Sequence, residues 1–172
     1  GIDIWEAIKG ASSKPFGFMP FYPGPGVGGH CIPLDPLYLA WKAKEYNYFS
    51  RFIELASDIN NNMPYYAVHQ MGQILGHMGK GMKGSRILLV GMSYKKDIGD
   101  MRESPSLDVY EVLKKRGPEI DFYDPYITSF DSKQGKIQGI ELSAESLKLY
   151  DLVVILVGHS KVDYEFILQN AK

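Results

Sequence analysis

The sequence of 172 residues contains a single cysteine, Cys31, and no long hydrophobic run. One cysteine excludes a disulfide within the chain, and four histidines without neighbouring thiols form no recognisable zinc site. No run reaches the ~20 apolar residues that a membrane-spanning helix needs, and no basic leader precedes an apolar stretch. We therefore expect a soluble protein without a metal site, in a reducing, cytoplasmic setting.

The sequence also lacks an excess of either charge, because 19 Lys and Arg residues nearly balance 20 Asp and Glu residues. A net charge of −1 creates no field that would attract nucleic acid or an acidic membrane surface, so we expect neither as a partner. Any recognition of phosphate must therefore be local. With 45% hydrophobic residues, the chain can bury a core large enough for one large or two small domains.

Helical spacing of apolar residues dominates the first half of the chain. It predicts a helix from about residue 4, another over 37–47 after Asp35-Pro36, and a long helix over about 50–78, which Pro64 should bend or split. The glycine-rich segment 76–85 then indicates a linker.

Beyond the linker, short apolar runs alternate with helical patterns. Segments 86–94, 119–125 and 151–158 read as strands, and helices are expected over 104–116, over 143–149 and from about residue 163. This alternation predicts an α/β fold: a partial helical central domain over residues 1–80, followed over residues 84–172 by a small Rossmann-like domain with a doubly wound parallel sheet. The first helix has no capping residue before it and the last has no following strand. We therefore expect an excised fragment whose second domain is truncated at its end.

Segment 15–36 is rich in Gly and Pro, and residues 24–29 formally satisfy the dinucleotide fingerprint G-x-G-x-x-G. The context excludes that interpretation, because no strand precedes the glycines and prolines flank the turn. Two interpretations remain: a structural loop, or glycines that let backbone amides approach a phosphate or sugar and hold Cys31 at a pocket wall. We favour the second.

Lone cysteines are more often inert core residues than nucleophiles, but Cys31 follows glycines in a loop that a substrate can reach. A free thiol has a pKa of about 8.5, so a catalytic role requires amides or a cation that stabilise the thiolate. Asp35 lies four residues further on. It either positions a water or accepts a proton, or it caps the following helix, and the spacing does not decide between these roles.

The segment 93–104, SYKKDIGDMRES, follows the first predicted strand, at the carboxyl edge where open α/β sheets bind ligands. Its mixed charges fit a solvated loop. They also fit a phosphate site, where cations and the amides of a helix start converge. The sequence pattern leaves both interpretations open. The charged residues are Lys95, Lys96, Asp97, Asp100, Arg102 and Glu103.

Together, FYPGPGVGGHCIPLDP (21–36) and SYKKDIGDMRESPSLDVYEVL (93–113) resemble the UDP-glucose/GDP-mannose dehydrogenase family. The elements Gly-Gly-x-Cys-x-x-x-Asp and Lys-x-x-x-x-x-x-Arg-x-Ser-Pro occur in the family's order, and the resemblance covers essentially the whole chain. The form Pro-Gly-Pro-Gly-x-Gly-Gly-His-Cys-Ile-Pro resembles the branch acting on UDP-N-acetylhexosamines more than the UDP-glucose branch. It is similar above all to the UDP-N-acetylglucosamine 6-dehydrogenases of surface-polysaccharide synthesis.

This resemblance implies oxidation of a sugar C6 alcohol to a carboxylate with two molecules of NAD. Cys31 would attack the C6 aldehyde and form a thiohemiacetal, which is oxidised to a thioester, and Asp35 would orient the hydrolytic water. Lys95 would contact the sugar nucleotide, and Arg102 would reach the cofactor side of the cleft. Lys14 would contribute to a neighbouring subunit's site. The sugar pocket would be lined by Phe21, Tyr22 and the backbone of Gly26, Gly28 and Gly29.

The resemblance also implies that the NAD-binding Rossmann domain is missing from this chain, so the fragment alone should be inactive. The helix over 50–78 would form the core of a homodimer. Two alternatives remain open at this stage. One is a UDP-glucose 6-dehydrogenase, and the other is a nucleotide-sugar-binding module without chemistry.

Overall fold

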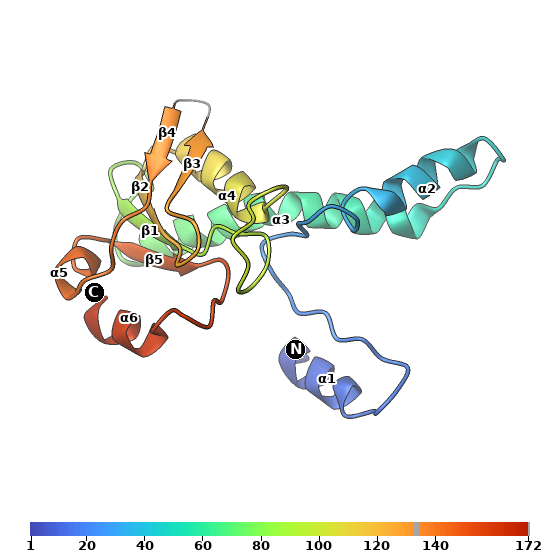
Figure 1. The fold of residues 1–172 in the computed structure, drawn as a ribbon, viewed down its shortest axis with the longest axis horizontal. Helices are drawn as coiled ribbons and strands as arrows, with labels where there is room; N and C mark the ends of the chain where they lie inside the picture. Colours follow the sequence, from blue (N-terminus) through green and yellow to red (C-terminus); the bar gives the residue numbers. More distant parts are fainter. Residues whose placement is uncertain (133–134, 172) are drawn as a thin grey trace.

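The computed structural model describes residues 1–132 and 135–171 (Figure 1). A helical segment comes first, and a small parallel sheet with its own helices follows. The elements are α1 (Ile4–Ser12), α2 (Asp35–Lys44), α3 (Arg51–His77), β1 (Arg86–Val90), α4 (Pro105–Lys114), β2 (Glu119–Tyr123), β3 (Ser129–Ser132), β4 (Gly135–Gln138), α5 (Ala144–Leu147), β5 (Leu152–Ile155) and α6 (Tyr164–Asn170).

The three parallel strands have the order β2-β1-β5, so the chain reverses direction across the sheet at β1. Side chains alternate along β1. Ile87 and Leu89 join one core with α3, α4 and β2, while Leu88 and Val90 join a second core with α5 and α6. Both faces of the sheet are therefore covered, which confirms the predicted α/β fold with a parallel sheet.

The long predicted helix forms, but Pro64 does not split it, because α3 continues through this residue. Proline lacks an N–H, so the carbonyl of Asn60, four residues earlier, loses its helical donor. Pro64 itself is buried, and the Asn60 side chain donates to the Ala56 carbonyl at 2.8 Å. The remaining turns keep α3 continuous on both sides of this single missing bond.

The first helix is capped, contrary to the sequence interpretation. The Asp3 carboxylate accepts hydrogen bonds from the backbone N–H groups of Trp5, at 2.8 Å, and Glu6, at 3.4 Å. An aspartate immediately before a helix is a favoured N-cap because it satisfies N–H groups that have no helical partner. The expectation that no capping residue precedes this helix was therefore wrong.

A hairpin of β3 and β4, between β2 and α5, was also missed. Its strands have four residues each and are mostly polar, so they carry little apolar alternation. Phe130 packs the hairpin on the sheet, because its buried ring lies 5.1 Å from the rings of both Tyr110 and Phe122, and Ile137 of β4 packs against the same core.

The helix α3 belongs to two parts of the molecule. Its first half pairs with α2 in a helical hairpin that extends away from the sheet (Figure 1). Its second half contributes Val68, Met71 and Leu75 to the core that covers β1. The division of the chain near residue 80 therefore stays a prediction. Among the described residues, no helix combines the length and apolar character needed to cross a bilayer.

Candidate active site

Cys31 lies in an exposed turn that leads into α2. Its carbonyl oxygen accepts the N–H groups of Leu34 at 3.1 Å and Asp35 at 2.8 Å. Asp35 is the first residue of α2 and is exposed. The thiol and the carboxylate therefore belong to one hydrogen-bonded turn, and both are open to a substrate.

The glycines before Cys31 permit close packing against the loop that follows β1. A Cβ atom at Gly28 would lie 2.6 Å from the carbonyl oxygen of Glu103, 2.6 Å from Cδ of Pro105 and 2.9 Å from Cβ of Tyr94. At Gly29, which has φ of 93°, a Cβ would lie 3.1 Å from the Tyr94 ring. Because Gly28 and Gly29 have no side chains, the Cys31 loop packs closely against the loop that follows β1. The predicted contact of these glycines with a sugar stays a prediction.

The two sequence motifs that suggested chemistry therefore lie side by side. Tyr94 joins them, because its ring meets that of His30 edge to face at 6.3 Å between centroids. Lys95 follows Tyr94 and is exposed. Arg102, on the same loop, is held by Asp100 at 2.7 Å, and these hydrogen bonds lower the pKa of Asp100 to about 2. A role of Arg102 at a cofactor requires that it share its guanidinium with Asp100.

Three other predicted residues lie on the segment between α1 and the Cys31 loop. Tyr22 stacks on Trp5 with ring centroids 5.9 Å apart, and Lys14 lies over the Phe16 ring at 5.4 Å. Phe21 is exposed. This segment and α1 lie apart from the sheet (Figure 1). Tyr22 thus contacts α1 and Lys14 contacts Phe16, and the roles of all three residues in a sugar pocket and at a neighbouring subunit stay predictions.

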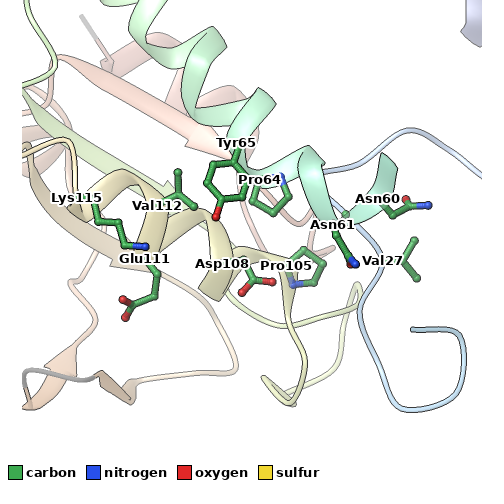
Figure 2. Close-up of a pocket in the computed structure, with 11 residues that line it drawn as sticks. Val27, Asn60, Asn61, Pro64, Tyr65, Pro105, Asp108, Glu111, Val112 and Lys115 are labelled. Atoms are coloured by element: carbon green, nitrogen blue, oxygen red, sulfur yellow. The ribbon is translucent and has the colours of Figure 1, made fainter. Parts of the chain in front are cut away.

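A cavity of about 510 Å³ lies between α3, α4 and the start of the Cys31 loop (Figure 2). It does not include Cys31, Asp35, Lys95 or Arg102. Two carboxylates, Asp108 and Glu111, line it with one cation, Lys115. Burial, followed by the charge of Glu103, raises the pKa of Asp108, yet the cavity remains unsuited to a diphosphate because its walls are rich in carboxylates. We therefore place the candidate site at the exposed turn instead.

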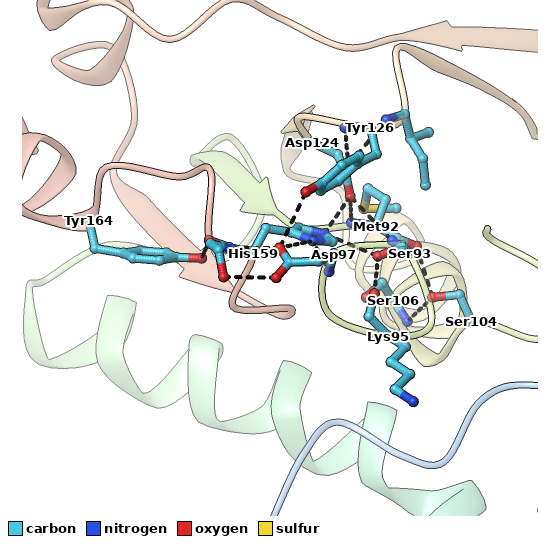
Figure 3. A network of polar contacts seen from close by, with 12 residues as sticks. Met92, Ser93, Lys95, Asp97, Ser104, Ser106, Asp124, Tyr126, His159 and Tyr164 are labelled. Carbon is cyan, nitrogen blue, oxygen red and sulfur yellow. Dashed lines mark hydrogen bonds and ion pairs between the residues drawn. The ribbon is translucent and has the colours of Figure 1, made fainter. Parts of the chain in front are cut away.

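A buried polar cluster at the carboxyl ends of the three parallel strands was missed by the sequence analysis (Figure 3). Ser93 follows β1, Asp124 follows β2 and His159 follows β5, and all three are buried. The signal was available, because carboxyl ends of parallel strands meet at one edge of a sheet. Asp124 was interpreted only as the end of a strand, and His159 received no role.

The glycine segment 24–29 does not form a Rossmann dinucleotide loop. The glycines at 24–29 follow no strand and pack on Tyr94 and Pro105, so they are not available to a pyrophosphate as a Rossmann loop is. Within residues 1–132 and 135–171, no group of three or more His, Cys, Asp or Glu side chains is arranged to hold a metal ion.

Comparison with known proteins gives consistent matches. The central domain of the UDP-glucose/GDP-mannose dehydrogenase family matches residues 1–62, and the UDP-binding domain of the same family matches residues 88–171. A UDP-N-acetyl-D-mannosamine dehydrogenase of Methanococcus maripaludis is 33% identical over 160 residues, which cover 92% of this chain and 34% of the relative. A UDP-N-acetyl-D-glucosamine 6-dehydrogenase of Pseudomonas aeruginosa is 33% identical over 162 residues, covering 94% and 37%.

The fold agrees with these matches. The structure of a UDP-D-ManNAc dehydrogenase from Pyrococcus horikoshii superposes with a TM-score of 0.82 at 28% identity, covering 100% of this chain and 39% of that one. The chain thus spans between 34% and 39% of the length of these three proteins. The two domain matches cover both sequence motifs, in the order in which the motifs occur. The chain belongs to the UDP-glucose/GDP-mannose dehydrogenase family.

Proposed function

We propose that this chain is the part of an NAD-dependent dehydrogenase that holds a UDP-N-acetylhexosamine and oxidises its C6 alcohol to a carboxylate through Cys31. One observation carries the proposal: the exposed turn of Cys31 and Asp35 rests directly on the loop that carries Lys95. The relatives named for UDP-N-acetylmannosamine and UDP-N-acetylglucosamine support an N-acetylhexosamine as the sugar. The product, a UDP-linked uronic acid, fits surface-polysaccharide synthesis.

Cys31 provides the covalent step. Its thiolate adds to the C6 aldehyde, and the resulting thiohemiacetal carries the C–H bond whose hydride is removed in the second oxidation. The thioester that remains is cleaved by water, which releases the carboxylate and restores the thiol. Asp35 would orient that water, which is supported by its position in the same hydrogen-bonded turn as Cys31. Bound NAD supplies the hydride acceptor for both oxidations and would be held mainly by residues outside this chain.

The nucleotide side of the site lies at the carboxyl edge of the sheet. The strand order reverses at β1, and open α/β sheets bind ligands at such a switch point. Lys95 and Lys96 stand in the loop that leaves β1, and Lys161 follows β5 on the other side of the switch point. Three cations near one edge favour a diphosphate, in contrast to the carboxylates of the large cavity.

The first test measures the NADH formed per molecule of sugar by the full-length protein. We expect two NADH per UDP-N-acetylglucosamine or UDP-N-acetylmannosamine, and at least about tenfold lower kcat/KM with UDP-glucose and GDP-mannose, because contacts to the N-acetyl group contribute ~1–3 kcal/mol. A reducing cytoplasm, which keeps Cys31 a free thiol, suits this chemistry. No NADH from any of these sugars, in a folded protein that binds UDP, would refute the proposal in favour of a binding module.

A second expectation concerns assembly through α3. Phe52, Leu55, Ile59 and Tyr66 are exposed on one face of this helix. We propose that this face forms a homodimer, and expect Leu55→Asp to convert the full-length dimer to monomer in sedimentation, because a charge is costly in an apolar interface. Leu149→Asp is the matched control, since Leu149 is 52% exposed and Leu55 56%. Equal sedimentation of the two variants would contradict this surface.

A further inference from the structure

We propose that Ser93, Asp124 and His159, the carboxyl-end cluster, are positioning residues that hold the Lys95 loop in the geometry that receives the UDP group. The inference rests on the proposed function for its ligand, but its structural part is independent of it. The cluster is buried beneath the loop that carries Lys95 (Figure 3), so it acts through that loop and not by contact with substrate.

Asp124 connects two strand ends. Its Oδ2 accepts the backbone N–H of Met92 at 2.7 Å and of Ser93 at 3.3 Å, just beyond β1. Its Oδ1 accepts the N–H groups of Tyr126 at 2.8 Å and Ile127 at 3.1 Å, just beyond β2. A buried carboxylate that accepts this many N–H groups fixes the direction in which the chain leaves β1.

His159 adds the third strand end and reaches the loop itself. Its Nδ1 accepts the backbone N–H of Asp97 at 2.9 Å, so Nδ1 carries no proton and the neutral ring is protonated at Nε2. Nε2 lies 3.1 Å from Asp124 Oδ2 and 3.1 Å from Ser93 Oγ. The Ser93 hydroxyl in turn donates to the Lys95 carbonyl at 2.9 Å. The ring therefore contacts the loop on both sides of Lys95, directly at Asp97 and through Ser93.

The cluster contains the residue types of a hydrolase triad, but its geometry excludes nucleophilic chemistry. A triad places the nucleophile and the carboxylate at opposite ring nitrogens. Here both Ser93 and Asp124 lie at Nε2, and the backbone N–H of Asp97 occupies Nδ1. Ser93 is also fully buried, so no substrate reaches its hydroxyl. What the geometry supports is the holding of a loop.

The exposed side chain of Asp97 makes a second contact between the Lys95 loop and the turn after β5. Oδ1 of Asp97 accepts the N–H of Ser160 at 2.7 Å and Oδ2 accepts its hydroxyl at 2.8 Å, which lowers the pKa of Asp97. The residue has φ of 59°, a left-handed conformation that Asp, Asn and Gly tolerate better than other residues. The turn after β5 thus holds the Lys95 loop through two neighbouring contacts, one buried and one exposed.

The consequence reaches the Cys31 side of the site. Tyr94 lies between Ser93 and Lys95, and Gly28 and Gly29 pack on its side chain. A displacement of the loop at Ser93 or Asp97 therefore displaces Lys95, which is proposed to bind the UDP group. It also displaces Tyr94, against which the Cys31 loop packs.

The test compares three substitutions of His159 in the full-length protein. His159→Asn keeps an acceptor where Nδ1 stands, whereas His159→Gln keeps a group near Nε2 and loses the contact with Asp97. We expect His159→Gln and His159→Leu to raise the KM for the UDP-sugar roughly tenfold, as expected when a buried N–H loses its acceptor, and His159→Asn to stay within about threefold of wild type. Hydrogen exchange in residues 93–103 should accelerate in His159→Gln and His159→Leu but not in His159→Asn.

Tyr150→Phe is the matched control, because it removes a hydrogen bond of 2.9 Å from Tyr150 to Asp121 while leaving the carboxyl-end cluster intact. It should lower stability without changing the KM or the exchange of residues 93–103. Equal effects of Tyr150→Phe and His159→Leu, or unchanged exchange in His159→Leu, would overturn the proposal. If the wild type oxidises no UDP-sugar, the proposed function fails, and the exchange measurement alone still decides whether the cluster holds the loop.

A second pair of variants keeps the proposal testable should His159→Leu not fold. Asp97→Gly tolerates the left-handed backbone but loses both contacts with Ser160, whereas Asp97→Asn can retain an acceptor for the Ser160 N–H. Asp97 is exposed, so neither change disturbs a core. We expect faster exchange in residues 93–103 and a several-fold higher KM for Asp97→Gly only. Identical behaviour of the two variants would contradict the proposal.

Discussion

Replacing Cys31 with alanine is expected to lower kcat for oxidation of the UDP-sugar to its acid by at least about a thousandfold in the full-length protein, as loss of a covalent nucleophile does in other enzymes. The reason is chemical, because without the thiol the C6 aldehyde has no group that converts it into a tetrahedral hydride donor. The second NADH per sugar should be lost, and aldehyde or its hydrate should accumulate. Both are measured from NADH absorbance and product mass.

The melting temperature of Cys31→Ala distinguishes a loss of chemistry from a loss of folded protein. Cys31 is exposed, and substitutions at exposed positions without special contacts usually change the free energy of unfolding by no more than ~0.5 kcal/mol. The melting temperature of Cys31→Ala should therefore match that of the wild type. If the variant retains two NADH per sugar at the wild-type rate, Cys31 is not the nucleophile and the exposed turn has lost its chemical role.

Much of the fold was predictable from periodicity. Buried strands with both faces covered are continuous apolar runs, and RILLV in β1 and LVVI in β5 were predicted on that basis. The third strand, β2, was predicted from the segment EIDFYDP, which ends at Asp124-Pro125. The helices that begin near Ser104 and Asp163 were predicted from helical spacing, and in the structure these two residues cap them. The β3–β4 hairpin was missed because its strands are short and polar, and because Phe130 and Ile137 pack it on a core formed by distant residues.

The candidate site also contains residues that local motifs suggest and residues that the sequence analysis missed. Cys31 and Lys95 could be proposed from the sequence because their motifs are local, and the packing of one motif on the other explains the glycines of the Cys31 loop. The carboxyl-end cluster joins residues that are 31 to 66 positions apart in sequence. Periodicity carries no information about contacts at such separations. Only the rule that parallel strands end at one edge would have brought Ser93, Asp124 and His159 together before the structure did.

The close packing of the Cys31 loop on the Lys95 loop predicts a large effect of a substitution at Gly28. Gly28→Ala should destabilise the full-length protein by ~1–3 kcal/mol, as overpacking does in a tight contact, and should lower kcat/KM for the UDP-sugar at least about tenfold. The added Cβ would lie 2.6 Å from the Glu103 carbonyl oxygen and 2.6 Å from Cδ of Pro105. Neither a backbone carbonyl nor a proline ring can turn aside, so the turn that carries Cys31 has to move.

Gly24→Ala is the matched control within the same loop, because the nearest atom to its added Cβ is the Gly26 carbonyl oxygen at 3.9 Å. It should leave both the melting temperature and kcat/KM near the wild-type values. Parallel losses in the two variants would mean that the loop needs flexibility at its glycines and not close approach. A loss confined to Gly28→Ala would mean that the position of Cys31 depends on direct packing against the Lys95 loop, so that the thiol and the nucleotide side of the site are held by one contact.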